Sequence, residues 1–315
     1  MKTKSGAQRG LLILLFLILS LVNIGSGQTP PSATGHYDKA TKAFTDKKYD
    51  DAIVEYTRAI EISSQFGDAY VGRGLAYGNQ GKYDLAIADF SRALEISPEN
   101  ANALRGRGIV FSNQGKYDLA LADFTKALEK FTGVAELWNR RGKIYLKLGR
   151  FELAVADFTE SIKRRQYDVF VEPLLNRGIS YKLLGKADLA IADYTAVITT
   201  RGAASAGLTD AYNERGQLYA RQGKFDLSIA DFAELIKISP QNADAYLNRG
   251  VVHGLQGKYN QAVADFTDSI RINSKSWNAY ANRAFLYCKT GNRALAEADE
   301  KSVILLGGKL IEKCK

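Results

Sequence analysis

The chain has 315 residues, of which 46% are hydrophobic and 24% charged, and 43 basic against 34 acidic residues give a formal net charge of +9. These fractions are ordinary for a folded soluble protein and exclude a low-complexity or largely disordered chain. The positive excess is mild, and most aromatic residues recur in register with apolar ones, so we do not expect a nucleic-acid-binding protein.

The first 27 residues have the organisation of a secretory signal peptide. Three basic residues and no acid precede an apolar run at 11–22, and small residues at 25–27 offer a cleavage site. The run is short for a bilayer-spanning helix, which needs about 20 residues. We therefore expect residues 1–27 to be removed and the protein to be exported to the periplasm or the medium. An uncleaved membrane anchor is the alternative.

A short spacer at 28–35, rich in turn-forming residues, is expected to be flexible. From there to residue 306 the chain repeats a unit whose best copy is residues 67–100. The period is 34 residues, and extra residues before the fifth and sixth copies are expected to lie in loops. The copies start near residues 33, 67, 101, 135, 171, 209, 243 and 277.

Each copy is predicted to form two antiparallel helices. In the best copy, Gly74 lies on the apolar stripe of the first helix, and Ala86 and Phe90 lie on that of the second. Small residues opposite each other let the helix backbones approach closely, and the aromatic ring fills the remaining space. Gly81 can take the left-handed conformation that ends a helix. The spacing therefore predicts a helix, a tight turn and a second helix in every copy.

This pattern resembles the tetratricopeptide repeat family over about nine-tenths of the chain. The resemblance implies an all-α fold, a right-handed superhelical solenoid of about eight helix-turn-helix repeats. It also implies a function in holding a segment of another protein. The family's aromatic, small, tyrosine, alanine, aromatic and proline positions are met by Tyr70, Gly74, Tyr77, Ala86, Phe90 and Pro98.

The first and last copies depart from the pattern, as terminal repeats do because one face meets water. Lys47 stands where later copies have the helix-ending glycine, and Glu300 stands in the last aromatic position. Residues 307–315 are expected to form a capping tail, in which Leu310 and Ile311 cover the last apolar face.

The sequence contains no motif for catalysis, and we expect a non-enzymatic protein with no cofactor and no metal. His36 and His253 fall in aromatic columns of the repeat and are expected to be packing residues. Cys288 and Cys314 lack the spacing of a metal site. Export would permit a disulfide, but one cysteine is expected on a groove face and the other in the tail, which favours unpaired cysteines.

A basic residue precedes the small residue of every first helix, and an acidic residue recurs in every second helix. In an antiparallel pair these positions come close together, so we expect one structural ion pair per repeat. A row of arginines that grips an anionic ligand is the alternative, which an acid beside every arginine disfavours. The first copy has Lys39 and Glu55 instead. The expected pairs are Arg73–Asp89, Arg107–Asp123, Arg141–Asp157, Arg177–Asp193, Arg215–Asp231, Arg249–Asp265 and Arg283–Asp299.

First-helix residues that lie away from the glycine stripe are expected to line the concave side of the solenoid. In the fourth to sixth copies they predict a cationic groove with apolar pockets, suited to an acidic segment of a partner. Plain solvated lysines are the alternative. The groove residues are Asn139, Lys143, Leu146, Lys147, Leu175, Ile179, Lys182, Leu183, Asn213, Gln217 and Arg221.

Two functions from different classes follow. The first is an exported scaffold that binds a protein or peptide in its concave groove, where the cations favour an acidic one. The second, prompted by the net positive charge, is a binder of an anionic cell-envelope polymer. If the signal is not cleaved, the protein is instead a membrane-anchored adaptor, and a membrane partner is expected only in that case.

Overall fold

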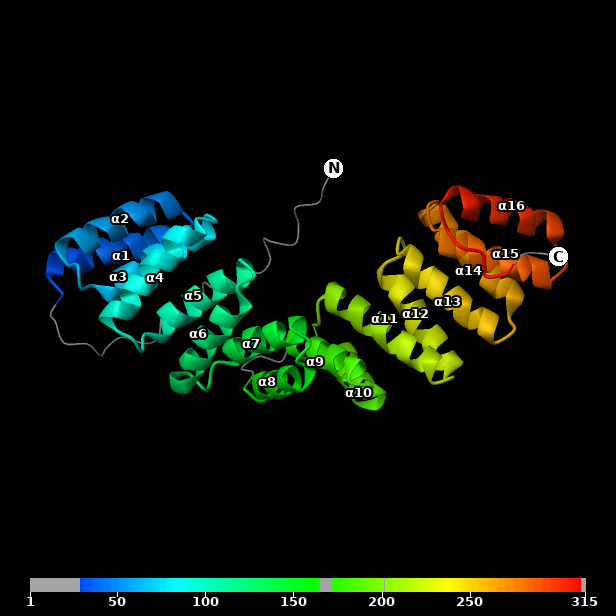
Figure 1. Ribbon diagram of the computed structural model, residues 1–315, viewed down its shortest axis with the longest axis horizontal. Coiled ribbons are helices and arrows are strands. Elements are labelled where there is room, and N and C mark those ends of the chain that lie inside the picture. The colour runs from blue at the N-terminus through cyan, green and yellow to red at the C-terminus, as the bar shows by residue number, and fades with distance from the viewer. Residues whose placement is uncertain (1–28, 165–170, 201, 313–315) are drawn as a thin grey trace. The chain divides into compact units, whose positions relative to one another are not determined.

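The computed structural model describes residues 29–164, 171–200 and 202–312. Within these residues the protein is all-α, with sixteen helices and no strand, and the helices form successive hairpins (Figure 1). The prediction of an α-solenoid of helix-turn-helix repeats is confirmed. The predicted signal peptide, residues 1–27, lies outside the described residues. Among the helices that are described, none is both long and apolar enough to cross a membrane.

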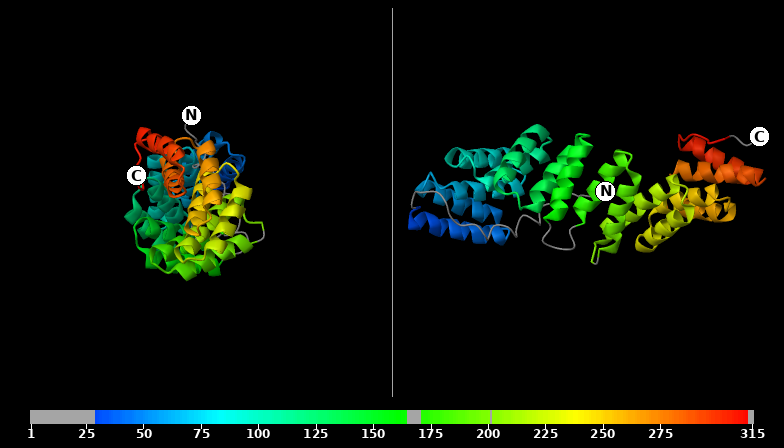
Figure 2. Two further views of the ribbon diagram at one scale, coloured as in Figure 1. Left: turned by 90° about the vertical axis from the view of Figure 1, so that its right-hand side faces the viewer. Right: turned by 90° about the horizontal axis from the view of Figure 1, so that it is seen from below.

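The helices form two compact units, divided between Ile144 and Tyr145. Unit 1 contains three hairpins, and the second helix of one hairpin contacts the first helix of the next. The right view of Figure 2 shows these hairpins, in blue to green, side by side. Helix α7, Ala135–Lys147, crosses the division. The hairpins of unit 1 are α1 (Pro31–Thr45) with α2 (Tyr49–Ile62), α3 (Gly67–Asn79) with α4 (Tyr83–Ile96), and α5 (Ala101–Asn113) with α6 (Tyr117–Lys130).

Unit 2 contains the end of α7, then α8, and repeats the same arrangement in four further hairpins. Again each second helix contacts the first helix of the next hairpin. Its helices are α8 (Phe151–Lys163), α9 (Glu172–Leu183), α10 (Ala187–Thr199), α11 (Ser205–Arg221), α12 (Phe225–Ile238), α13 (Ala243–Leu255), α14 (Tyr259–Ile272), α15 (Trp277–Lys289) and α16 (Arg293–Leu305).

The two helices of a hairpin pack closely because the first carries a glycine where the second places an aromatic ring. A Cβ atom at Gly250 would lie 2.7 Å from Cε1 of Phe266, and one at Gly178 would lie 2.7 Å from Cε1 of Tyr194. Phe266 is 2% exposed and Tyr194 is fully buried. The core of each unit therefore runs between its first and second helices, as the spacing predicts.

A left-handed residue follows the first helix of each hairpin. At Gly81 and Gly257 φ is 75°, a conformation that glycine adopts without strain. In the first hairpin Lys47 occupies this place with φ of 59°, the only non-glycine residue with positive φ in the described ranges. A side chain in this conformation costs about 1 to 2 kcal/mol. The turn of the first hairpin is therefore strained at Lys47, whereas the glycines in the turns of the later hairpins avoid this strain.

Two boundaries differ from the prediction. Helix α1 begins at Pro31, so residues 31–35 belong to the first helix and not to a flexible spacer. Proline is well suited to a first helical position, because the N–H that it lacks has no partner within the helix. Helix α11 begins at Ser205, before the expected start at 209, so part of the inserted segment lengthens a helix.

The carboxyl-terminal tail also differs from the prediction. Ile311 is 54% exposed and does not cover the last apolar face. The residue that approaches the last hairpin is Gly308, where an added Cβ would lie 2.6 Å from the indole of Trp277. The missing side chain of Gly308 allows the backbone to pass close to the ring. Of the two aliphatic residues that follow, Leu310 is half-buried and Ile311 is exposed.

Candidate functional site

The arginines of the first helices form two-point contacts with the aspartates of the second helices. Arg177 donates from Nε to Oδ2 of Asp193 at 2.9 Å and from Nη2 to Oδ1 at 2.6 Å. The aspartate side chain is 7% exposed and that of the arginine 18%. Parallel N–H···O bonds of this kind fix the orientation of both groups.

The same contact recurs along both units. In the first hairpin Glu55 instead accepts from Nδ1 of His36 at 2.7 Å and pairs with Arg58. Arg141 lies in unit 1 and Asp157, which is 3% exposed, lies in unit 2. The pairs that the structure brings together are Arg73–Asp89, Arg107–Asp123, Arg177–Asp193, Arg215–Asp231, Arg249–Asp265 and Arg283–Asp299.

Sequence reasoning missed a third contact of these arginines, to a hydroxyl in the preceding repeat. Arg177 donates from Nη1 to Oγ1 of Thr159 at 3.0 Å. The hydroxyl recurs with the period of the repeat, so a signal for it was present. Arg73, Arg107, Arg177, Arg215 and Arg283 therefore each join two second helices, their own and the preceding one. The acceptors are Thr57, Ser91, Thr125, Thr159, Thr195 and Thr267.

Arg249 differs, since the corresponding position of the preceding repeat holds Ala233. Here His253 bonds Oδ2 of Asp265 through Nδ1 at 2.9 Å and is itself 9% exposed. The histidine thus lies in the buried network of an ion pair.

The electrostatics of the pairs fit a structural role. The hydrogen bond to Asp193 raises the pKa of Arg177, and the bond to Asp231 raises the pKa of Arg215. Burial in turn raises the pKa of Asp231, against the lowering effect of Arg215. The desolvation cost of each carboxylate is thus offset only while its arginine stays in place. These arginines are engaged within the protein and do not form a row for an anionic ligand.

The predicted groove residues differ in how far the structure exposes them. Asn139 is 1% exposed and is therefore buried, not a groove residue. Lys143 and Lys147 are exposed but fall on opposite sides of the division between the units. Of the remaining predicted residues, Leu146, Leu175, Ile179, Lys182, Asn213 and Gln217 are half-buried, and Leu183 and Arg221 are exposed.

The predicted cations of unit 2 are partly neutralised. Lys182 on α9 donates to Oε2 of Glu214 on α11 at 2.5 Å, which corrects the expectation that it offers a free charge. Next to this pair, amide side chains come together on the first helices. Asn213 accepts from Gln217 at 3.2 Å and from Asn248 of α13 at 3.5 Å. The surface here is polar rather than strongly cationic.

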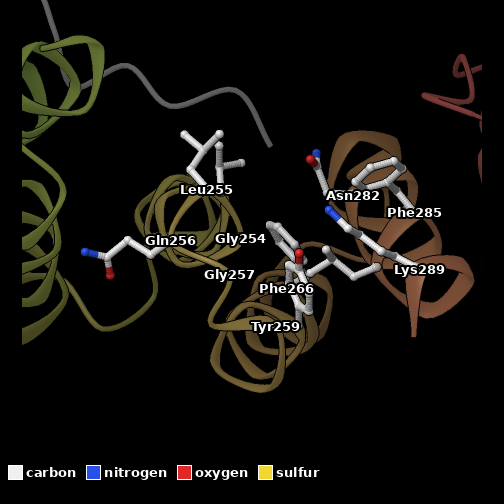
Figure 3. Close-up of a pocket in the computed structure, with 11 residues that line it drawn as sticks. Gly254, Leu255, Gln256, Gly257, Tyr259, Phe266, Asn282, Phe285 and Lys289 are labelled. Atoms are coloured by element: carbon white, nitrogen blue, oxygen red, sulfur yellow. The ribbon is translucent and has the colours of Figure 1, made fainter. Parts of the chain in front are cut away.

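A pocket of about 620 Å³ lies further along unit 2, between α13, α14 and α15 (Figure 3). Its size falls within the range of about 300 to 1,000 Å³ that is usual for ligand pockets. Phe266 and Leu286, both nearly buried, belong to its inner wall, whereas Leu255 is 61% exposed. The lining residues are Val251, Gly254, Leu255, Gln256, Gly257, Tyr259, Phe266, Asn282, Phe285, Leu286 and Lys289.

The polar groups of the pocket come mainly from α15. Asn282 and Lys289 extend from that helix towards the side that carries Leu255 (Figure 3). The ammonium group of Lys289 lies 5.0 Å from the ring centroid of Tyr259 and 5.9 Å from that of Phe285. Gln256 points away and donates to Oδ1 of Asp226 at 2.8 Å. These residues belong to the seventh and eighth copies, whereas the groove is predicted from the sequence in the fourth to sixth copies.

The described residues contain no group of three or more side chains suited to hold a metal ion. Cys288 is disulfide-bonded, so the expectation of an unpaired thiol at this position is wrong. Cys314 lies outside the described residues.

Helical hairpins with this packing define the chain as an α-solenoid repeat protein. It belongs to the tetratricopeptide repeat family, since models of that repeat match well over half of the chain. Those described as "Tetratricopeptide repeat" match residues 67–100, 105–169, 139–208 and 243–276, and one described as "TPR repeat" matches 44–81 and 216–257. No match is found among curated proteins.

Solved structures of similar fold have low sequence identity and carry information on the fold alone. A tetratricopeptide repeat protein from Parabacteroides merdae is 19% identical, with 89% of this chain and 100% of that one covered and a TM-score of 0.55. The carboxyl-terminal part of a repeat protein from Cytophaga hutchinsonii is 16% identical (78% and 98% covered, TM-score 0.66). PilF of Pseudomonas aeruginosa is 20% identical (68% and 94% covered, TM-score 0.55).

Proposed function

We propose that this protein is an exported, non-enzymatic scaffold that binds a segment of another protein on the surface of its first helices. The observation that carries the proposal is the pocket between α13 and α15 in unit 2. The side chains of Leu255 and Val251 at its rim are 61% and 36% exposed. Both residues lie on α13, whose opposite face is buried in the core. Apolar walls with a few polar groups are typical of sites that bind part of a protein or a small ligand.

The ion pairs support a protein partner over a strongly anionic polymer. Six arginines of the first helices are paired with aspartates within the fold, and Lys182 is paired with Glu214. A polyanion binder needs several cations that are free to contact the ligand. The half-apolar pocket is better suited to a peptide side chain than to a sugar phosphate.

Site-specific photo-cross-linking in the native host tests this proposal. A benzophenone amino acid at Leu255, on the rim of the pocket, is expected to give an adduct with one protein. The same residue at Leu295 on α16, which is 51% exposed and lies outside the pocket, is the matched control and is expected to give none. Equal adducts at both positions, or none at either, would contradict binding at the pocket. An adduct that yields sugars would favour the envelope polymer.

The export part of the proposal rests on the basic residues, the apolar run at 11–22 and the small residues at 25–27. The mature chain is expected to begin at or near Gln28. Sequencing of the amino terminus of the protein from its native host measures this directly. An intact amino terminus in the membrane fraction would replace the exported scaffold with a membrane-anchored one.

A further inference from the structure

The pocket of unit 2 contains a glycine that neither the backbone nor the packing requires. Gly254 lies within helix α13 and its φ is not positive. An added Cβ there would meet no atom within 4 Å. Gly250, one turn earlier, differs because its Cβ would lie 2.7 Å from Phe266. Glycine within a helix is less favourable than alanine. Gly254 therefore makes the helix less stable than alanine would, and this loss is not offset by closer packing.

The same pocket contains a positive charge that has no negative partner among the residues that the structure describes. None of the lining residues is acidic. Lys289 is exposed, and among the described residues its ammonium group contacts only the rings of Tyr259 and Phe285. Cation–π contacts hold the ammonium over the pocket but leave its charge unpaired. The amide of Asn282 lies on the same helix and the same side (Figure 3). Its Nδ2 donates to the backbone carbonyl of Asn278 at 2.8 Å, which leaves the second N–H of the amide for a ligand.

Amide side chains continue from the pocket along the neighbouring first helices. Asn248 on α13 donates to Asn213 on α11, and α11 and α13 are in contact. Amides can bond both the N–H and the C=O groups of an extended peptide. A chain that continues past the pocket would meet these amides on the neighbouring helices, whereas a chain that ends in the pocket would not. The amides therefore favour an internal segment over a chain end.

We propose that this pocket recognises an internal, extended segment of a partner protein in which a bulky aliphatic or aromatic side chain lies next to an aspartate or glutamate. The apolar side chain fills the space over Gly254, between Leu255 and Phe285. The carboxylate pairs with Lys289 and accepts from the second N–H of the Asn282 amide, the one that does not bond Asn278. This inference rests on the proposed scaffold function and adds the chemical class of the segment.

Selection of phage-displayed random dodecapeptides on the full chain tests the inference. Wild-type protein is expected to enrich peptides with an aromatic or aliphatic residue beside an acid. For a selected peptide, Lys289→Gln should weaken binding about tenfold, the loss expected for one charge-assisted contact. Lys275→Gln, in the exposed loop before α15, is the matched control and should leave the affinity unchanged.

A second variant blocks the pocket without removing a contact of the fold. Gly254→Met is expected to abolish binding while the thermal midpoint stays the same or rises, since the added side chain meets open space. If the enriched peptides are apolar but not acidic, or if Lys289→Gln binds them as wild type does, the inference fails and the scaffold proposal stands. If binding needs a free carboxyl terminus, shown by loss on amidation, the internal segment is wrong. No enrichment at all would overturn both proposals.

Discussion

Replacing Arg177 with alanine should lower the free energy of unfolding by about 3 to 5 kcal/mol, because it leaves Asp193 buried without its partner. The variant also removes the bond to Thr159 of the preceding repeat. Urea unfolding followed by circular dichroism measures the change. Lys275→Ala, in an exposed loop, is the control and should change the stability by less than about 0.5 kcal/mol.

A double variant separates two contributions to this loss of stability: the cost of leaving Asp193 buried and unpaired, and the net stabilisation that the intact ion pair provides. Two apolar residues of similar size, Arg177→Met with Asp193→Leu, remove both charges and should recover much of the stability, because no charge then stays buried and unpaired. If Arg177→Ala unfolds no more easily than the lysine control, the arginines do not hold the hairpins together, and the alternative of a ligand-binding arginine row gains support.

Replacing Phe232 with alanine should destabilise unit 2 by about 3 to 5 kcal/mol. The ring is 1% exposed and packs with Leu235, Ala245 and Val252, so its loss leaves a cavity between the helices. Leu227→Ala on the same helix is the matched control, since Leu227 is 50% exposed, and its effect should stay within about 0.5 kcal/mol. Similar urea midpoints for the two variants would show that the aromatic column does not form the core.

Features that recur in every copy could be predicted from the sequence. The glycine, alanine and aromatic columns indicate helical hairpins because every copy packs its two helices together with the same residue types. The arginine and aspartate columns are in the same class, since Arg177 and Asp193 keep their spacing from copy to copy. The hydroxyl column of Thr159 repeats with the same period, so its contact could have been found by the same reasoning.

Features that depend on how neighbouring repeats meet could not be predicted in the same way. Asn139 is polar and lies on a first helix, yet it is buried, which its place in a single copy does not indicate. Lys182 meets Glu214, 32 residues later, only because α9 and α11 are adjacent. The pocket is lined by residues of three helices, among them Gly254 of α13, Tyr259 of α14 and Lys289 of α15. A single copy of the repeat contains none of these relations.

The central claim is that a segment of a partner protein binds in the α13–α15 pocket of unit 2. Methyl NMR of the leucine and valine side chains, during titration with the peptide that the selection recovers, measures this most directly. We expect the methyl signals of Val251 and Leu255 to shift as the peptide is added, whereas those of Leu227 and Leu295, exposed elsewhere on the unit, stay in place. Shifts at Leu227 or Leu295 without a shift at Leu255 would contradict the claim.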